Sequence, residues 1–342
     1  MSFLRWGLPR DPRATQHLTA FMVTGVATVL LTRGGLAAAG YPSVGGSRLH
    51  VAHVLWGGLL LAVAVLLQFS FVGPVVRPAA AVLGGIGFGL FIDEVGKFVT
   101  RDNDYFFRPA AAIIYGTVIV FILASHLVHG RPLQPAEHLA AAVFQAVSGV
   151  AAGLSPYRRT DATGHLRAAG DLRAGPETAA LLAALPAGAD DLGHRIARTV
   201  TGRAHRVLAS RPATAVTVAL LVLEVIAGVL TAAATLFALV LFPKALVENA
   251  DQVLATLMSA SAMTSAAFIL TGLLRLGRDR AAAFAWFQRA ILLDLLVTQL
   301  LDAVLSQFGT VFGVLVDVAI LGVIAAERAR LRQPSPLVGH SR

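Results

Sequence analysis

The sequence predicts an all-α, polytopic transmembrane helix bundle of about eight helices. Of the 342 residues, 56% are hydrophobic and only 14% are charged, whereas about a quarter of the residues of a soluble domain are charged. The apolar residues form long blocks, and about twenty such residues cross ~30 Å of hydrocarbon. A single segment in lipid satisfies its own backbone hydrogen bonds only as a helix, so each block predicts one membrane-spanning helix.

The apolar blocks fall into two groups of four, separated by a long polar stretch. The blocks cover residues 16–32, 49–71, 78–100, 109–128, 213–242, 253–274, 281–305 and 310–326. This order predicts an N-terminal four-helix membrane region, a cytoplasmic helical connector, a C-terminal four-helix membrane region and a cytoplasmic tail. These four parts cover residues 1–129, 130–212, 213–327 and 328–342.

The first apolar block has two interpretations. Three arginines precede it and residues 37–39 are all alanine, a pattern that also fits a signal peptide with a cleavage site. A retained first helix is preferred, because further apolar helices follow at once. Cleavage would leave seven helices and the same orientation for the rest of the chain.

The polar stretch 130–212 predicts a small helical insertion. Residues 140–154, 176–185 and 192–208 have helical patterns, with breaks at Pro156, Pro176 and Pro186. The insertion either lies on anionic lipid headgroups or forms a solvated connector between the two membrane regions. The residues that would contact the headgroups are Arg195, Arg198, Arg203 and Arg206.

The distribution of positive charge predicts the orientation of the chain. Arginines collect around residues 5–13, 77, 275–280 and 328–332, which lie on one side of the predicted membrane. The side richer in Arg and Lys is cytoplasmic, which places both termini there. The same distribution accounts for the net charge of +9, so we expect the lipid bilayer and no nucleic acid as partner. Arginine-, alanine- and glycine-rich composition indicates a bacterial plasma membrane protein.

Polar residues gather at the predicted outer ends of the second and third helices. His50 and His53 are three residues apart, so they share one face of the second helix. Asp93, Glu94 and Lys97 lie near the end of the third helix. Consecutive helices joined by a short connection usually pack together, so we expect the two groups to face each other.

This combination of side chains suits two kinds of chemistry. Two imidazoles and one or two carboxylates, His50, His53, Asp93 and Glu94, match the ligands of a divalent metal such as zinc. With bound metal, Asp93 or Glu94 would act as the catalytic base. The same set would also form a proton relay. Further polar residues at this end are Lys97, Asp102, Asp104 and Tyr105.

Structural interpretations of these residues stay open beside the functional ones. Asp93 and Glu94 with Lys97 would form a self-neutralising cluster near the interface. His50 and His53 would be interfacial residues beside Trp56. Within the second half of the chain, we expect Arg289 to form an architectural ion pair with Glu224, because ionisable groups in lipid normally point into the bundle.

Three segments resemble uncharacterised bacterial multi-pass integral membrane proteins that have no assigned function. The segments are 50–57, 87–115 and 286–309. The matching features are the His-containing start of the second helix, the Asp93-Glu94 pair and residues 102–105. The resemblance implies a membrane protein and no particular substrate.

Three functions follow from the sequence as hypotheses. The first is an integral membrane protein with an outward-facing polar or metal-binding site that hydrolyses or modifies a lipid-linked substrate. The second is a proton- or cation-coupled transporter in which the Asp93, Glu94 and Lys97 group titrates. The third is a non-catalytic membrane scaffold whose connector binds a partner. Cysteine is absent, which excludes disulfides and thiolate chemistry.

Overall fold

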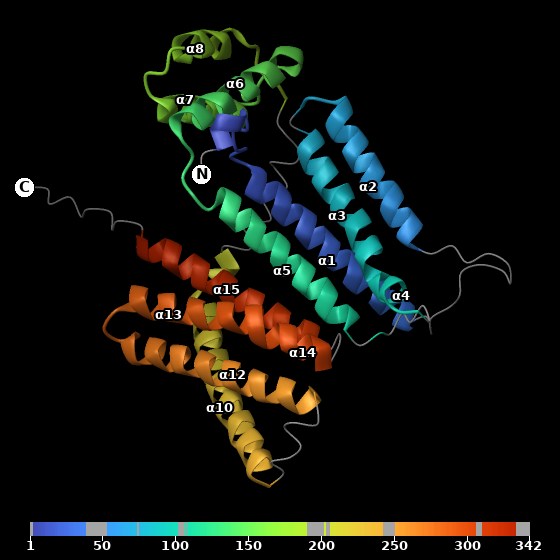
Figure 1. Ribbon diagram of the computed structural model, residues 1–342. Coiled ribbons are helices and arrows are strands. Elements are labelled where there is room, and N and C mark those ends of the chain that lie inside the picture. The colour runs from blue at the N-terminus through green and yellow to red at the C-terminus, as the bar shows by residue number, and fades with distance from the viewer. Residues whose placement is uncertain are drawn as a thin grey trace, which may run out of the picture. The chain divides into compact units, whose positions relative to one another are not determined.

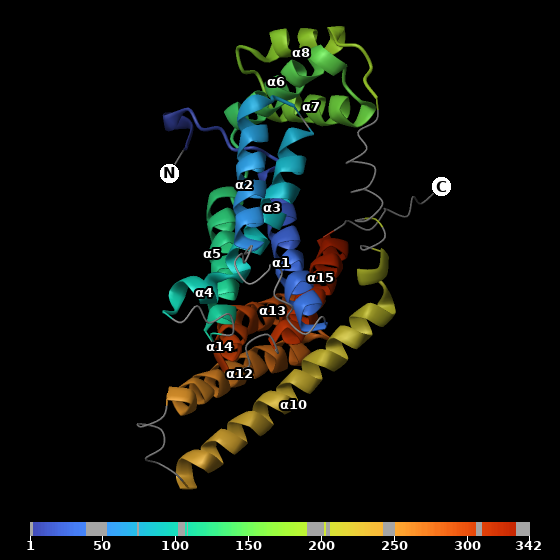
Figure 2. The ribbon, with the colours of Figure 1, turned by 90° about the vertical axis from the view of Figure 1, so that its right-hand side faces the viewer.

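The computed structural model describes residues 3–38, 53–73, 75–101, 107, 109–189, 202, 206–241, 250–305 and 310–332. Within these ranges the chain is helical and contains no β-strand, so the predicted all-α class is confirmed. The long helices are α1 (Ala14–Ala38), α2 (His53–Ser70), α3 (Val76–Asp93), α5 (Ala110–His129), α10 (Arg211–Leu241), α12 (Ala250–Arg275), α13 (Arg280–Leu293) and α15 (Val311–Arg332). Figures 1 and 2 show them from two directions.

Seven helical spans in the described part of the chain are long and apolar enough to cross a membrane, which fits a membrane-embedded protein. They correspond to the first seven predicted blocks. The eighth block forms α15, whose apolar part ends at Glu327 and Arg328. With Asp317 this helix carries three charges within its first eighteen residues, so the count of eight spans stays a prediction.

The chain folds as two compact units. The first consists of Met1–Phe107 and Thr117–Ala197, and the second of Arg108–Gly116 and Arg198–Arg342. Helix α5 contributes to both, because its first turns belong to the second unit and the rest to the first. Residues 130–189 of the predicted connector belong to the first unit, and its described residues from 202 onwards belong to the second.

Helix α3 is the centre of the first unit, because it packs against both α1 and α2. Glycines permit this close approach. A Cβ atom on Gly57 of α2 would lie 2.7 Å from the carbonyl oxygen of Gly87, and a Cβ on Gly89 would lie 2.5 Å from that of Gly25 on α1. Such distances are shorter than van der Waals contact, so the backbones touch only where side chains are missing.

Residues 130–189 of the connector contain three helices, α6 (Pro135–Ala152), α7 (Pro156–Ala169) and α8 (Gly175–Ala184). In Figure 1 they lie at the N-terminal end of α1, whereas the short helix α4 (Val95–Val99) lies near its other end. Leu154 and Leu182 are buried between these connector helices. Helix α7 is missing from the sequence prediction, because it is arginine-rich and has no apolar periodicity, although Ser155 caps its N-terminus.

The second unit has its own core, which α10, α12, α13 and α15 share. Phe284 and Phe287 of α13 are fully buried there and pack edge to face, with ring centroids 5.6 Å apart. After α13 the chain forms one π-helical turn, η2 (Asp294–Thr298), before it continues as α14 (Gln299–Leu305). Single π-turns inside helices frequently occur at functional sites.

Candidate functional site

Three helices of the first unit bring charged residues together at one end. Arg33 lies on α1 near its C-terminal end, and His53 is the first residue of α2. Asp93 is the last residue of α3, and Glu94 follows it directly. This end carries α4 and is opposite to the end that carries α6–α8 (Figure 1). The site therefore depends on the glycine-mediated packing of α3 against α1 and α2.

The imidazole of His53 lies between two carboxylates. Its Nε2 atom is 3.0 Å from Oδ2 of Asp93, and its Nδ1 atom is 2.9 Å from Oε1 of Glu94. A neutral imidazole has one donor and one acceptor nitrogen, whereas an imidazolium donates from both. Both contacts are therefore favourable only when an additional proton lies on the ring or on one of the two carboxyl groups.

The two carboxyl groups are buried. The side chain of Asp93 is 0% exposed and that of Glu94 is 1% exposed, whereas His53 is 24% exposed. A buried carboxylate is stable only if cations or hydrogen-bond donors compensate it. Nε of Arg33 lies 2.6 Å from Oδ1 of Asp93, and its NH2 group donates to the Asp93 carbonyl at 2.9 Å. Asp93 is therefore held by Arg33 on one side and by His53 on the other.

A break in the helix allows both carboxylates to reach one imidazole. Neighbouring residues of a regular helix point about 100° apart, so two consecutive carboxylates would not meet the same ring. Helix α3 ends at Asp93, and Glu94 has φ −87° and ψ 7° before α4 begins at Val95. This turn redirects Glu94, and Lys97 of α4 then approaches its Oε1 atom at 3.3 Å.

The charges of four of the five side chains in this cluster cancel. Arg33 and Lys97 supply two positive charges, and Asp93 and Glu94 supply two negative charges. The extra proton between His53 and its two carboxylates would give the five side chains a net charge of +1. Glu94 Oε1 is shared between His53 and Lys97, so Lys97 can compensate Glu94 when the imidazole is neutral.

The structure brings together four of the residues that the sequence singles out: His53, Asp93, Glu94 and Lys97. The other four, His50, Asp102, Asp104 and Tyr105, lie outside the described residues. Arg33 is a member of the cluster that the sequence prediction missed. Its position at the same predicted end of its helix as Asp93 and His53 was the available signal, because charges at equal depth on packed helices tend to pair.

The zinc hypothesis needs a different arrangement of donors from the one described. Among the residues that the structure describes, no group of three or more His, Asp or Glu side chains is placed to hold a metal ion. His53 directs one nitrogen to each carboxylate, whereas a single ion needs donors that converge on one point. A site that includes His50 stays a prediction.

A second polar group lies in the second unit, next to the π-turn. The amide nitrogen of Gln299 donates to Oδ2 of Asp317 at 2.8 Å and lies 3.3 Å from Oδ2 of Asp294. The hydroxyl of Thr310 donates a hydrogen bond to Oε1 of Gln299 at 2.7 Å. One amide thus orients two carboxyl groups that approach it from α15 and η2.

The predicted ion pair between Arg289 and Glu224 is wrong. Both residues are described, and their side chains do not come within salt-bridge distance. The guanidinium of Arg289 instead lies over the ring of Trp286, 4.5 Å from its centroid. The aromatic face, three residues earlier on the same helix, is a closer partner for the cation than a carboxylate on another helix.

Comparison of the chain with known protein families, with curated proteins and with solved structures finds no match.

Proposed function

We propose that this chain is a proton- or cation-coupled membrane transporter in which His53, Asp93 and Glu94 form the proton-binding site. The observation that carries the proposal is the imidazole of His53, which lies 3.0 Å and 2.9 Å from two different buried carboxylates. Intramembrane ionisable residues are costly and commonly mark proton relays, and histidine is the side chain whose charge changes most readily near neutral pH.

The members of the cluster have different roles in this proposal. Asp93 is fixed by Arg33 and positions the imidazole. Glu94 can pair with either His53 or Lys97, because both contact its Oε1 atom. His53 and Lys97 are 24% and 25% exposed, so a proton can reach the imidazole while the carboxylates stay buried.

The orientation of the chain is part of the same proposal. The arginine-rich end of the first unit faces the cytoplasm, as expected from the positive-inside rule, and the His53 cluster faces the outside of a bacterial plasma membrane. Protons would then enter from outside through His53, and the transported species would be a small solute or cation.

The first experiment measures proton uptake into proteoliposomes with an internal pH-sensitive dye and an imposed inward pH gradient. We expect His53→Gln and Glu94→Gln to lower the uptake rate by about tenfold or more, since positioned proton-transfer groups contribute ~10²–10⁴-fold. His126→Gln is the control, because His126 lies near the far end of α5 and outside the cluster. Equal rates in wild type and both variants would contradict the proposal.

A second measurement needs no knowledge of the transported species. Nuclear magnetic resonance of protein labelled with ¹⁵N-histidine distinguishes a neutral imidazole from an imidazolium. We expect the His53 signal, identified by its absence from His53→Gln, to change to that of an imidazolium on acidification and to shift in Glu94→Gln. A His53 ring that stays neutral on acidification to about pH 5, well below the ordinary histidine pKa, would count against a proton-binding role.

A further inference from the structure

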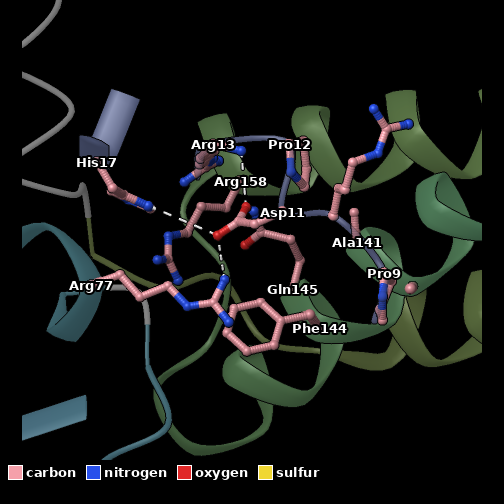
Figure 3. Close-up of a pocket in the computed structure, with 12 residues that line it drawn as sticks. Pro9, Asp11, Pro12, Arg13, His17, Arg77, Ala141, Phe144, Gln145 and Arg158 are labelled. Carbon is pink, nitrogen blue, oxygen red and sulfur yellow. Dashed lines mark hydrogen bonds and ion pairs between the residues drawn. The ribbon is translucent and has the colours of Figure 1, made fainter. Parts of the chain in front are cut away.

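A cavity of about 210 Å³ lies at the other end of the first unit. It is bounded by the segment before α1, the first turns of α1 and α3, and the connector helices α6 and α7 (Figure 3). Four of its lining residues are arginines, and one is an aspartate. The charged and titratable residues that line it are Arg10, Asp11, Arg13, His17, Arg77 and Arg158.

Two of the arginines, Arg10 and Arg13, are fixed by contacts with residues outside the cavity lining. Arg10 pairs with Glu137 at 2.6 Å and also donates to the carbonyl of Pro132. Arg13 pairs with Asp161 at 2.8 Å and lies over the ring of Tyr157. These contacts tie the N-terminal segment to α6 and α7, so the guanidinium groups are preorganised.

A third arginine, Arg77, lies at the N-terminal end of α3 and contacts two residues of the cavity lining. Its guanidinium lies 4.5 Å from the centroid of the Phe144 ring of α6, and it forms an ion pair with Asp11. Arg158 of α7 completes the set and is 5% exposed. Four guanidinium groups thus surround the cavity, against the carboxylates of Asp11, Glu137 and Asp161.

Asp11 already shows what kind of group this cavity attracts. One of its oxygens accepts a hydrogen bond from the backbone N–H of Arg13 at 2.9 Å, and the other contacts Arg77 and, at 3.8 Å, His17 (Figure 3). A carboxylate of the chain therefore occupies part of the anion-binding surface. A larger anion with several oxygens would compete with Asp11 for Arg77 or bind beside it.

We propose that this pocket binds a phosphate-bearing anion, either the headgroup of an anionic phospholipid or a free phosphorylated small molecule. The planar guanidinium fork matches phosphate oxygens in a bidentate manner. The N-terminal ends of α1 and α3 add partial positive charge. A volume below the ~300–1,000 Å³ of typical ligand pockets fits a headgroup-sized molecule, and basic pockets beside membrane helices bind such headgroups.

The test measures the thermal unfolding temperature of the full chain in a neutral detergent. One series is titrated with inorganic phosphate and another with short-chain phosphatidylglycerol, with short-chain phosphatidylcholine as the uncharged reference. We expect a saturable rise with phosphatidylglycerol or with phosphate, and none with phosphatidylcholine. The probe that saturates at the lower concentration identifies the lipid headgroup or the free phosphate as the ligand.

Two variants shift the affinity in opposite directions. Arg77→Gln should weaken binding by about tenfold, the value of one charge-assisted contact. Asp11→Asn should strengthen it, because the competing carboxylate is neutralised while the side-chain oxygen of Asn can still accept the hydrogen bond from the backbone N–H of Arg13. Arg278→Gln, in an exposed turn of the second unit, is the control and should bind like wild type.

The expected increase in affinity of Asp11→Asn keeps the test valid even if Arg77→Gln does not fold, because a misfolded variant would not bind the anion more tightly. No saturable shift with either anion would overturn the proposal. Equal affinities in wild type, Arg77→Gln and Asp11→Asn would overturn it as well, because the anion would then bind elsewhere.

Discussion

The two ends of the first helical unit use the same helices for opposite electrostatic arrangements. At one end, two buried carboxylates are surrounded by Arg33, His53 and Lys97. At the other end, four arginines line an open cavity, and carboxylates support them from the sides. In our proposals, the sign of the charge at the centre of each end determines its ligand, which is a proton at the carboxylate end and an anion at the arginine end.

The largest expected effect is a difference in stability between two alanine variants. One removes the buried carboxylate of Asp93, and the other removes the more accessible carboxylate of Asp11. Asp93→Ala leaves Arg33 and His53 partly buried without their common partner, so the free energy of unfolding should fall by about 3–5 kcal/mol. Asp11→Ala removes a carboxylate that is 26% exposed and should cost about 1 kcal/mol, because it loses the hydrogen bond from the backbone N–H of Arg13 and a partly exposed ion pair with Arg77.

Equilibrium unfolding in mixed micelles measures both variants. The double variant Arg33→Leu/Asp93→Leu should be more stable than Asp93→Ala, because it removes the uncompensated cation as well. Similar losses in Asp93→Ala and Asp11→Ala would show that burial does not distinguish the two ends.

The next largest effect concerns Glu137, which anchors the arginine-rich end. The side-chain hydrogen bond from Arg10 lowers the pKa of Glu137 to about 2 from an ordinary value of 4.5. A depressed folded-state pKa contributes stability that is complete above the ordinary pKa of 4.5 and is lost as the pH falls from there to about 2. The loss should be on the order of 2–3 kcal/mol.

Unfolding midpoints of wild type and Glu137→Gln between about pH 6 and pH 2.5 check this prediction. The variant should be less stable at the upper end of this range, and the gap should close on acidification. Glu177→Gln, on an exposed position of α8, should follow wild type within ~0.5 kcal/mol. A constant gap across this pH range would mean that the Glu137 charge is not what stabilises the anchor.

A smaller effect tests the packing that both ends share. Gly57→Ala places a methyl group 2.7 Å from the carbonyl oxygen of Gly87, so the two helices must separate at a cost of ~1–3 kcal/mol. At Gly58, the adjacent position, a Cβ meets nothing within 4 Å, and alanine there should be neutral or slightly stabilising. Thermal unfolding in detergent compares them, and equal midpoints would contradict this account of the packing.

The sequence predicts the parts of this fold that local pattern controls. Hydropathy predicts the membrane helices, and the order of helix ends brings His53 towards Asp93 and Glu94. The helix break at Glu94 and the role of Arg33 depend on backbone geometry and on the contact between α1 and α3, which the sequence does not specify.

The arginine cavity was not predicted, because its contacts join distant parts of the chain. Arg77 meets Asp11 across 66 residues, and Arg13 meets Asp161 across 148. The predicted headgroup contacts through Arg195, Arg198 and Arg203 lie outside the described residues. Nothing in the local sequence indicates that α6 and α7 close the cavity.

The smallest expected effect is an acid response of the connector helices that is opposite to proton binding at the His53 cluster. Nδ1 of His138 on α6 lies 2.8 Å from Nδ1 of His165 on α7, and burial, aided by His138, lowers the pKa of His165. A histidine whose folded-state pKa is depressed binds protons more readily when unfolded, so stability falls as the pH drops below about 6.5.

The check compares unfolding midpoints at about pH 7.5 and pH 5.5, on either side of the ordinary histidine pKa. The wild-type midpoint should be lower at the acidic pH, and this difference should be smaller in His165→Gln. The control variant His126→Gln should behave like wild type. The two ends then differ in their response to acid. The proton binding proposed for the His53 cluster is favoured by two carboxylates, whereas protonation of His165 in the connector is opposed by burial, by the imidazole of His138 and by Arg13. A midpoint difference that is unchanged in His165→Gln would assign the acid response to another group at this end, such as His17, a partly buried histidine of the cavity lining.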